Sequence, residues 1–136
     1  MTKEIYGTAA ETKALLRDGQ TYRLERLRAE DMITVDEAAS LMRVNASVIE
    51  GWIRNCRCIG LAGPHGAMVV PQWQFESSLW SSIRRIGQSL GTQDPWQILG
   101  FLETSAPALD GLTPRAALEQ GVPIGRVLNV AVADTH

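Results

Sequence analysis

The sequence is poor in histidine, the side chain that most often acts as a general acid or base. It has two histidines in 136 residues: His65 falls in a Gly-Pro-His-Gly turn and His136 is the last residue. Neither has a serine or carboxylate at a spacing that suggests a catalytic pair, and a general acid or base needs such a partner. We therefore expect no enzymatic activity and no cofactor.

Cysteine is equally scarce. Cys56 and Cys58 are the two cysteines, and one residue separates them. A disulfide across that spacing would be strained. A structural zinc site needs about four ligands, and the sequence offers no second cysteine pair. The sequence predicts partly buried, inert thiols and no metal site.

Long apolar runs and low-complexity segments are also missing. No stretch approaches the roughly 18 apolar residues of a membrane span, and the first residues lack the apolar core of a signal peptide. With 45% hydrophobic and 21% charged residues, the chain is expected to fold. We expect a cytoplasmic protein without membrane contact, built as one domain or two very small ones.

The net charge of −2 is unevenly distributed. Residues 43–85 contain five arginines and two glutamates, whereas the segments on either side are acidic. Local potential decides whether a protein attracts nucleic acid, so a mildly acidic chain with a basic middle can still bind it.

The N-terminal segment, residues 1–32, is rich in helix-forming residues. Asp18 and Gly19 predict a break between a first helix at residues 8–16 and a second at residues 20–29. Leu24 and Leu27 share a face of the second helix. A short amphipathic helix cannot bury this face alone, so it either packs on its own domain or supports dimerisation.

Residues 33–75 have the pattern of a helix-turn-helix followed by a wing. Thr34 and Glu37 form a capping box that starts a first helix, and Asn45 suits the N-cap of a second helix at residues 46–55. The second helix has apolar residues at the spacing of a buried stripe: Val48, Ile49, Trp52 and Ile53.

Two apolar runs around residues 63–66 predict a β-hairpin. Trp73 and Phe75 are two residues apart and are expected to face the same side of its return strand.

Residues 76–136 predict a compact helical domain. A helix at residues 76–90 would bury the stripe Leu79, Trp80, Ile83, Ile86 and Leu90. Three short helices follow. Asp94 and Thr113 are their expected N-caps, Gly121 ends the second, and Pro123 starts the third. The predicted fold class is mainly α, with a winged helix-turn-helix before a C-terminal helical domain.

Residues 80–133 resemble the C-terminal toxin-binding domain of the MbcA/ParS/Xre antitoxins. The matching positions are Pro107, Leu109, Gly111, Thr113, Pro114, Ala117, Leu118, Gly121, Val127 and Ala131. Residues 33–53 resemble the MerR/excisionase type of helix-turn-helix, where members of the antitoxin family often carry a Cro-like one. The resemblance implies a neighbouring toxin of the NAD-consuming RES type or a related ADP-ribosyl-transferring type.

A helix-turn-helix reads DNA with the exposed face of its second helix. On that face Arg54 is a strong donor to guanine or phosphate, Ser47 can contact either, and Glu50 can accept from a cytosine amino group. This surface offers few groups that can contact bases. The alternative is therefore a helix-turn-helix that serves as a scaffold and only packs or dimerises. The predicted DNA-binding residues are Arg43, Ser47, Glu50, Arg54, Arg57, His65, Arg84 and Arg85.

The last two helices and the tail are expected to cover the active site of the toxin. An acidic tail can pair with cations that hold a phosphate-bearing substrate there, and the alternative is a solvated face with a frayed end. The predicted toxin-binding residues are Arg115, Glu119, Arg126, Asn129, Asp134, Thr135 and His136.

Two functions therefore follow from the sequence. The first is an antitoxin of a type II system that inhibits a cognate toxin and represses its own operon by binding operator DNA. A single half-site with few base contacts binds weakly, so we expect a homodimer. The alternative is an excisionase- or MerR-like transcriptional or architectural regulator with no toxin partner.

Overall fold

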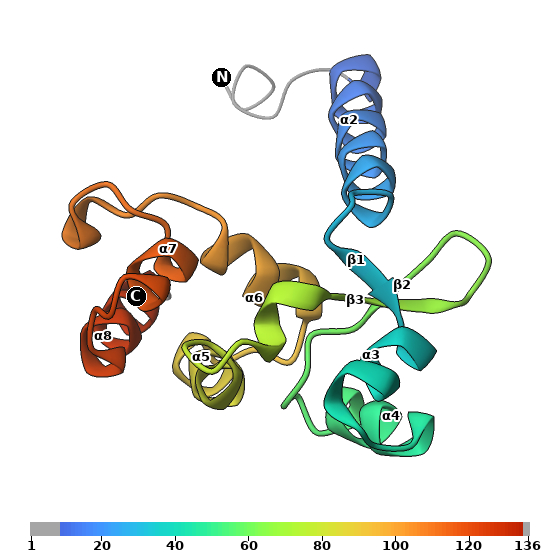
Figure 1. The fold of residues 1–136 in the computed structure, drawn as a ribbon. Coiled ribbons are helices and arrows are strands. Elements are labelled where there is room, and N and C mark those ends of the chain that lie inside the picture. Colours follow the sequence, from blue (N-terminus) through green and yellow to red (C-terminus); the bar gives the residue numbers. More distant parts are fainter. Residues whose placement is uncertain (1–8, 135–136) are drawn as a thin grey trace.

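The computed structural model describes residues 9–134, and within them the chain is mainly helical with a small three-stranded antiparallel sheet (Figure 1). The predicted mainly α class is confirmed. In this part of the chain, no helix combines the length and apolar character that crossing a bilayer requires.

Helix α2 (Ala9–Leu27) runs without interruption through Gly19, so the predicted break is wrong. A glycine inside a helix costs about 1 kcal/mol relative to alanine, which good helix formers on both sides offset. The Thr21 hydroxyl also donates to the Arg17 carbonyl at 3.0 Å, across the glycine. Leu27 packs against the larger core, whereas Leu24 is 40% exposed, and α2 projects from the body (Figure 1).

Helices α3 (Val35–Met42) and α4 (Ala46–Arg54) pack against each other across residues 43–45. The capping box is confirmed: the Glu37 amide donates to Thr34 Oγ1 and the Thr34 amide donates to Glu37 Oε1, both at 3.0 Å. Arg43 reverses the chain in the left-handed conformation, with φ of 56°. The expected stripe on α4 is narrower than predicted, because Ile49 is buried while Val48 is 37% exposed.

The sheet has the order β1-β3-β2, with both pairings antiparallel. Strands β2 (Leu61–Ala62) and β3 (Met68–Pro71) form the expected hairpin. Strand β1 (Met32–Thr34) was not expected, because three residues of mixed burial show no alternating pattern. Its pairing of Met32 with Pro71 connects the end of α2 and the start of α3 to the hairpin.

The segment after β3 is a 3₁₀ helix, η1 (Gln72–Phe75), and not an extended strand. With three residues per turn, positions two apart point in different directions. Trp73 enters the larger core while Phe75 packs against the smaller one, so the expectation that they share a face is wrong.

Gln74, which lies between Trp73 and Phe75 in the sequence, is fully buried. Its side chain accepts from the Ile59 amide at 2.7 Å and donates to the Ile59 carbonyl at 2.9 Å.

The helix predicted at residues 76–90 begins later than expected. A turn at residues 76–79 leads into the 3₁₀ helix η2 (Trp80–Ser82) and then α5 (Ile83–Leu90). This shift turns Trp80 away from the α5 stripe and toward Trp52 and Phe75, whose ring centroids lie 5.0 and 5.1 Å from its own.

The remaining elements are α6 (Pro95–Leu102), the 3₁₀ helix η3 (Pro107–Leu109), α7 (Pro114–Glu119) and α8 (Ile124–Asp134). Two predicted caps are confirmed: Asp94 accepts from the Trp96 amide and Thr113 from the Ala116 amide, both at 3.0 Å. Helix α8 packs against α5 and α7 (Figure 1).

Two apolar clusters form the core. The larger cluster contains buried residues of α5, α6, α7 and α8 together with Ile59, Leu61 and Trp73. The smaller cluster contains residues of α3 and α4 together with Cys58 and Val70. The hairpin contributes Leu61 to the larger cluster and Val70 to the smaller one. The larger cluster therefore contains residues from both sides of residue 75. This packing fixes the position of α4 relative to α5.

Candidate functional site

An open cleft of about 460 Å³ lies between the end of α4 and the outer face of α5. It brings together Arg54 and Arg84, two predicted DNA-binding residues that are thirty positions apart in the sequence. The lining residues are Arg54, Asn55, Cys56, Arg84, Gly87, Gln88, Gly91, Thr92 and Gln93.

Helix α4 places Arg54 through its own amphipathic pattern. Burial of Ile49 turns the opposite face to solvent, where Ser47, Glu50 and Arg54 are all exposed. Arg54 lies in the last turn of α4, where a cation interacts favourably with the helix dipole. These three predicted DNA-binding residues therefore share one exposed side of the helix.

Helix α5 places Arg84 in the same way. Ile83, Ile86 and Leu90 are buried, which leaves Arg84 and Gln88 exposed on the other side. Gly87 allows α6 to approach closely, since a Cβ there would lie 3.1 Å from Ile98 Cδ1.

The two cleft arginines are unpaired within residues 9–134: no described residue forms an ion pair or hydrogen bond with the guanidinium of Arg54 or Arg84. None of the nine described lining residues carries a carboxylate. The cleft is therefore a concentration of positive charge with amide and hydroxyl groups around it, a composition suited to an anion.

The other predicted DNA-binding residues lie outside the cleft. Arg57 stacks over Trp52 and Trp80, with its guanidinium carbon 5.3 and 5.2 Å from the ring centroids. Arg43 is exposed at the turn before α4, and Arg85 is exposed on α5. His65 is exposed in the loop between β2 and β3, which extends away from α3 and α4 (Figure 1).

Two of the predicted toxin-binding arginines are engaged within the chain. Arg115 lies over the Trp73 ring, 4.4 Å from its centroid, and its Nε is 3.1 Å from Glu119 Oε1. Arg126 donates to the Ala108 carbonyl at 2.8 Å. These contacts hold α7 against η1 and α8 against the η3 loop.

The other predicted toxin-binding residues are dispersed. Asn129 and Asp134 are exposed on α8, and Asp134 lines a hollow of about 410 Å³ with Phe101 and Val130. Arg115 lines a different hollow. Thr135 and His136 lie outside the described residues.

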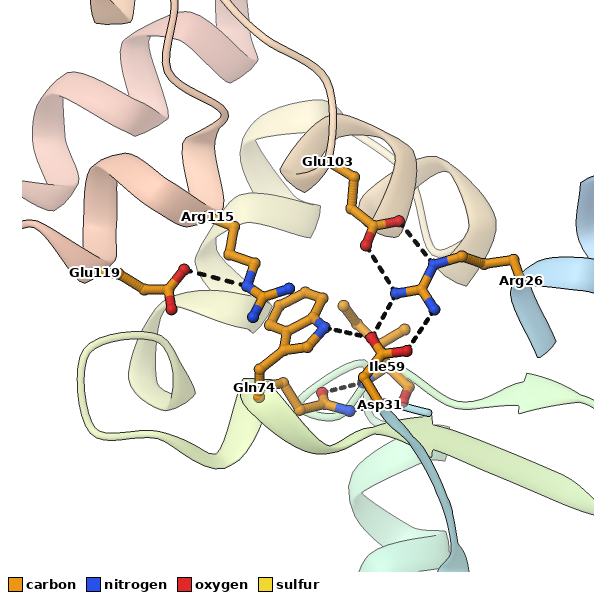
Figure 2. A network of polar contacts seen from close by, with 8 residues as sticks. Arg26, Asp31, Ile59, Gln74, Glu103, Arg115 and Glu119 are labelled. Atoms are coloured by element: carbon orange, nitrogen blue, oxygen red, sulfur yellow. Dashed lines mark hydrogen bonds and ion pairs between the residues drawn. The ribbon is translucent and has the colours of Figure 1, made fainter. Parts of the chain in front are cut away.

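A polar network that the sequence does not predict lies between the ends of α2 and α6 (Figure 2). Arg26 donates to both carboxylate oxygens of Asp31 at 2.7 and 2.6 Å, and to both of Glu103 at 3.0 and 2.7 Å. Asp31 also accepts from Trp73 Nε1 at 2.8 Å. The network therefore joins the end of α2 to α6 and to η1.

The network shifts the pKa of Asp31 and of Arg26. The hydrogen bonds from Arg26 hold the pKa of Asp31 below its ordinary value, with the Trp73 hydrogen bond acting in the same direction. The same two carboxylates raise the pKa of Arg26 above its usual range.

The two cysteines are free thiols. Cys58 is buried, and burial raises its pKa to about 12, so the thiolate form that reacts with electrophiles and metals is disfavoured. Cys56 is half-buried at the cleft. Within residues 9–134, no group of three or more histidine, cysteine or acidic side chains gathers as a metal site would require.

Sequence reasoning missed the polar partners of the cleft and the whole Arg26 network. Asn55, Gln88 and Gln93 gave no signal, because single amides at turns and helix surfaces are common. Arg26 and Glu103 are 77 residues apart, and no local pattern relates them.

No family model, curated protein or solved structure matches the chain.

Proposed function

We propose that this protein is a cytoplasmic, non-enzymatic regulator of the antitoxin type, which binds DNA through α3 and α4 and binds a protein toxin through its C-terminal helices. The observation that carries the DNA-binding part is the cleft with two unpaired arginines beside the exposed face of α4. Cations without internal partners are available to phosphates, which dominate the affinity of proteins for DNA.

In this proposal α3 and α4 are a helix-turn-helix, α4 is its reading helix, and the β2–β3 hairpin is its wing. The tight connection at Arg43 and the packing of Ala38 and Ala39 around Ile49 support that assignment. Ser47 and Glu50 would contact base edges, while Arg54 and Arg84 would hold the backbone. Because the hairpin loop extends away from α4, His65 would contact DNA at a point separate from the α4 contact.

The C-terminal helices support the second part, toxin binding. The loop between α6 and α7 is closed by hydrogen bonds from the Ala106 amide to the Leu112 carbonyl at 3.0 Å and from the Gly111 amide to the Ala106 carbonyl at 3.1 Å. Arg126 fastens the same loop to α8. A preorganised surface loses less conformational entropy on association, which favours protein binding.

The proposed homodimer would use α2. Tyr22 is 55% exposed and Leu24 40% exposed on a helix that projects from the body, and burying either side chain against a second copy would remove apolar surface from water. Two copies would also double the number of DNA contacts.

The DNA-binding part is tested with labelled DNA from upstream of the chain's own gene. We expect a complex at low salt that weakens as salt increases. Absence of any complex with this DNA at low salt would remove the DNA-binding proposal.

The toxin-binding part is tested by co-expression with the product of the neighbouring gene, scored as growth. Truncation after residue 126 is a poor test because Val127 and Ala131 are fully buried in the larger core. The exposed Asn129→Arg is preferable, with Ser78→Arg as the control, because Ser78 is exposed in the turn before η2 and lies outside the C-terminal helices. We expect loss of protection with the first variant alone. A neighbouring product that is harmless by itself would favour the regulator without a toxin.

A further inference from the structure

We propose that the cleft between α4 and α5 is a site for one phosphate group, held between the guanidinium groups of Arg54 and Arg84. This inference rests on the proposed function only for the source of the phosphate, which under that function is the DNA backbone.

The positive charge of the cleft is the first property that favours a phosphate. Arg54 and Arg84 lie in one cleft, they come from different helices, and no described carboxylate lines the cleft. An anion that enters the cleft is attracted by both guanidinium groups. A guanidinium also presents planar donors that match two oxygens of a phosphate.

The surrounding polar groups are the second argument. Asn55, Gln88 and Gln93 bring amide donors to the same cleft. The Thr92 oxygen accepts from the Asp94 amide at 3.0 Å, and its hydroxyl proton is given to no residue that the structure describes. These groups can bind phosphate oxygens that the two arginines leave unsatisfied.

Two other hollows of similar size in the described part of the chain differ from the cleft in charge. The hollow of about 400 Å³ beside Arg115 also contains Asp31 and Glu76, and the hollow of about 410 Å³ beside α8 contains Asp134 and no cation. Of these three hollows, only the cleft between α4 and α5 combines arginines with an absence of carboxylates.

The size of the cleft allows more than a bare ion. Its volume of about 460 Å³ lies within the roughly 300–1,000 Å³ of small-molecule sites, so a phosphate can enter with an attached sugar. Gly91 lines the cleft with φ of 69°, a conformation that disfavours a side chain, so this wall stays open. The phosphate can therefore belong to a nucleic-acid backbone or to a small phosphorylated ligand.

The first experiment uses inorganic phosphate as the probe, with the full chain and amide chemical shifts as the readout. Sodium chloride at equal ionic strength is the reference. We expect shifts at residues 87–93 that saturate with phosphate, and a weakening of about tenfold or more in Arg54→Gln and in Arg84→Gln. Arg28→Gln removes the same charge at an exposed position outside the cleft and should bind phosphate like the wild type. The remaining amide shifts report whether each variant is folded.

Equal responses to phosphate and chloride would overturn the proposal, as would phosphate binding that both cleft variants leave unchanged.

The second experiment identifies the source of the phosphate by measuring how the affinity for upstream DNA depends on salt. If the backbone occupies the cleft, the slope of log affinity against log salt falls by about one in each cleft variant and not in Arg28→Gln. Specific phosphate binding without DNA binding would assign the cleft to a small phosphorylated ligand and would remove the DNA-binding function. DNA binding with slopes unchanged in both cleft variants would reject the cleft as the backbone contact and leave the proposed function standing.

Discussion

Two pairs of arginines in this molecule have opposite surroundings. Arg26 lies between two carboxylates and has a side chain that is 12% exposed, while Arg115 is stacked on Trp73 and paired with Glu119. Arg54 and Arg84, in contrast, are exposed in a cleft without carboxylates. The same residue type therefore stabilises the fold in one region and is available to a ligand in another. Changing an arginine in the first region should affect stability, and changing one in the second should affect binding.

The largest effect on stability is expected for Arg26→Gln. The substitution leaves Asp31 and Glu103 partly buried and close together without their shared cation. Removing one partner of a fully buried pair costs about 3–5 kcal/mol, and partial exposure reduces this to about 2 kcal/mol. Urea unfolding followed by circular dichroism measures the loss. A midpoint equal to that of the wild type would break the contrast between the two pairs.

The same network predicts a loss of stability in acid. The pKa of Asp31 is lower in the folded protein than its ordinary value of 3.8, so the unfolded chain binds a proton more readily. The contribution of Asp31 is therefore present above pH 3.8 and is lost as the pH falls through the folded pKa. In urea unfolding at several pH values, the advantage of the wild type over Asp31→Asn should shrink below pH 3.8. A constant difference between the two proteins down to pH 2 would contradict this.

A smaller effect is expected for Arg115→Gln. Its ion pair with Glu119 joins half-exposed groups, and its contact with the Trp73 ring is of the cation–π type. Each contact contributes up to about 1 kcal/mol, so the variant should lose about 1 kcal/mol in urea unfolding. A loss of stability as large as that of Arg26→Gln would mean that the loss does not depend on how deeply the arginine is buried.

The smallest effect on stability is expected for Arg54→Gln and Arg84→Gln. Surface substitutions away from partners change stability by about 0.5 kcal/mol or less. Thermal unfolding should therefore give transitions close to that of the wild type. A marked decrease would show that these arginines support the fold and are not reserved for a ligand.

Local chemistry allowed part of this fold to be predicted. The capping box of Thr34 and Glu37, the caps at Asp94 and Thr113, and the hairpin were all confirmed, because each depends on residues close together in the sequence. The errors have two different causes. Gly19 did not break α2 because good helix formers on both sides offset its cost, and Trp73 and Phe75 enter different cores because η1 is a 3₁₀ helix.

The residue types of the candidate site could be predicted from the sequence, but which of these residues share the cleft could not. The basic character of residues 43–85 pointed to Arg54 and Arg84. That these two share a cleft, while Arg57 stacks on Trp52 and Trp80, depends on how α5 packs. The involvement of Gln93 depends on the turn at Gly91, which no pattern of apolar residues reports.

We propose that the protein binds DNA through Arg54 and Arg84, the two cleft arginines that have no partner among the described residues. The most direct measurement is fluorescence anisotropy of upstream DNA with the wild type and the double variant Arg54→Gln, Arg84→Gln at low salt, with thermal unfolding of the same samples. Two lost phosphate contacts predict a decrease in affinity of about a hundredfold or more without a matching loss of stability. Equal affinity of the two proteins for this DNA would contradict the claim.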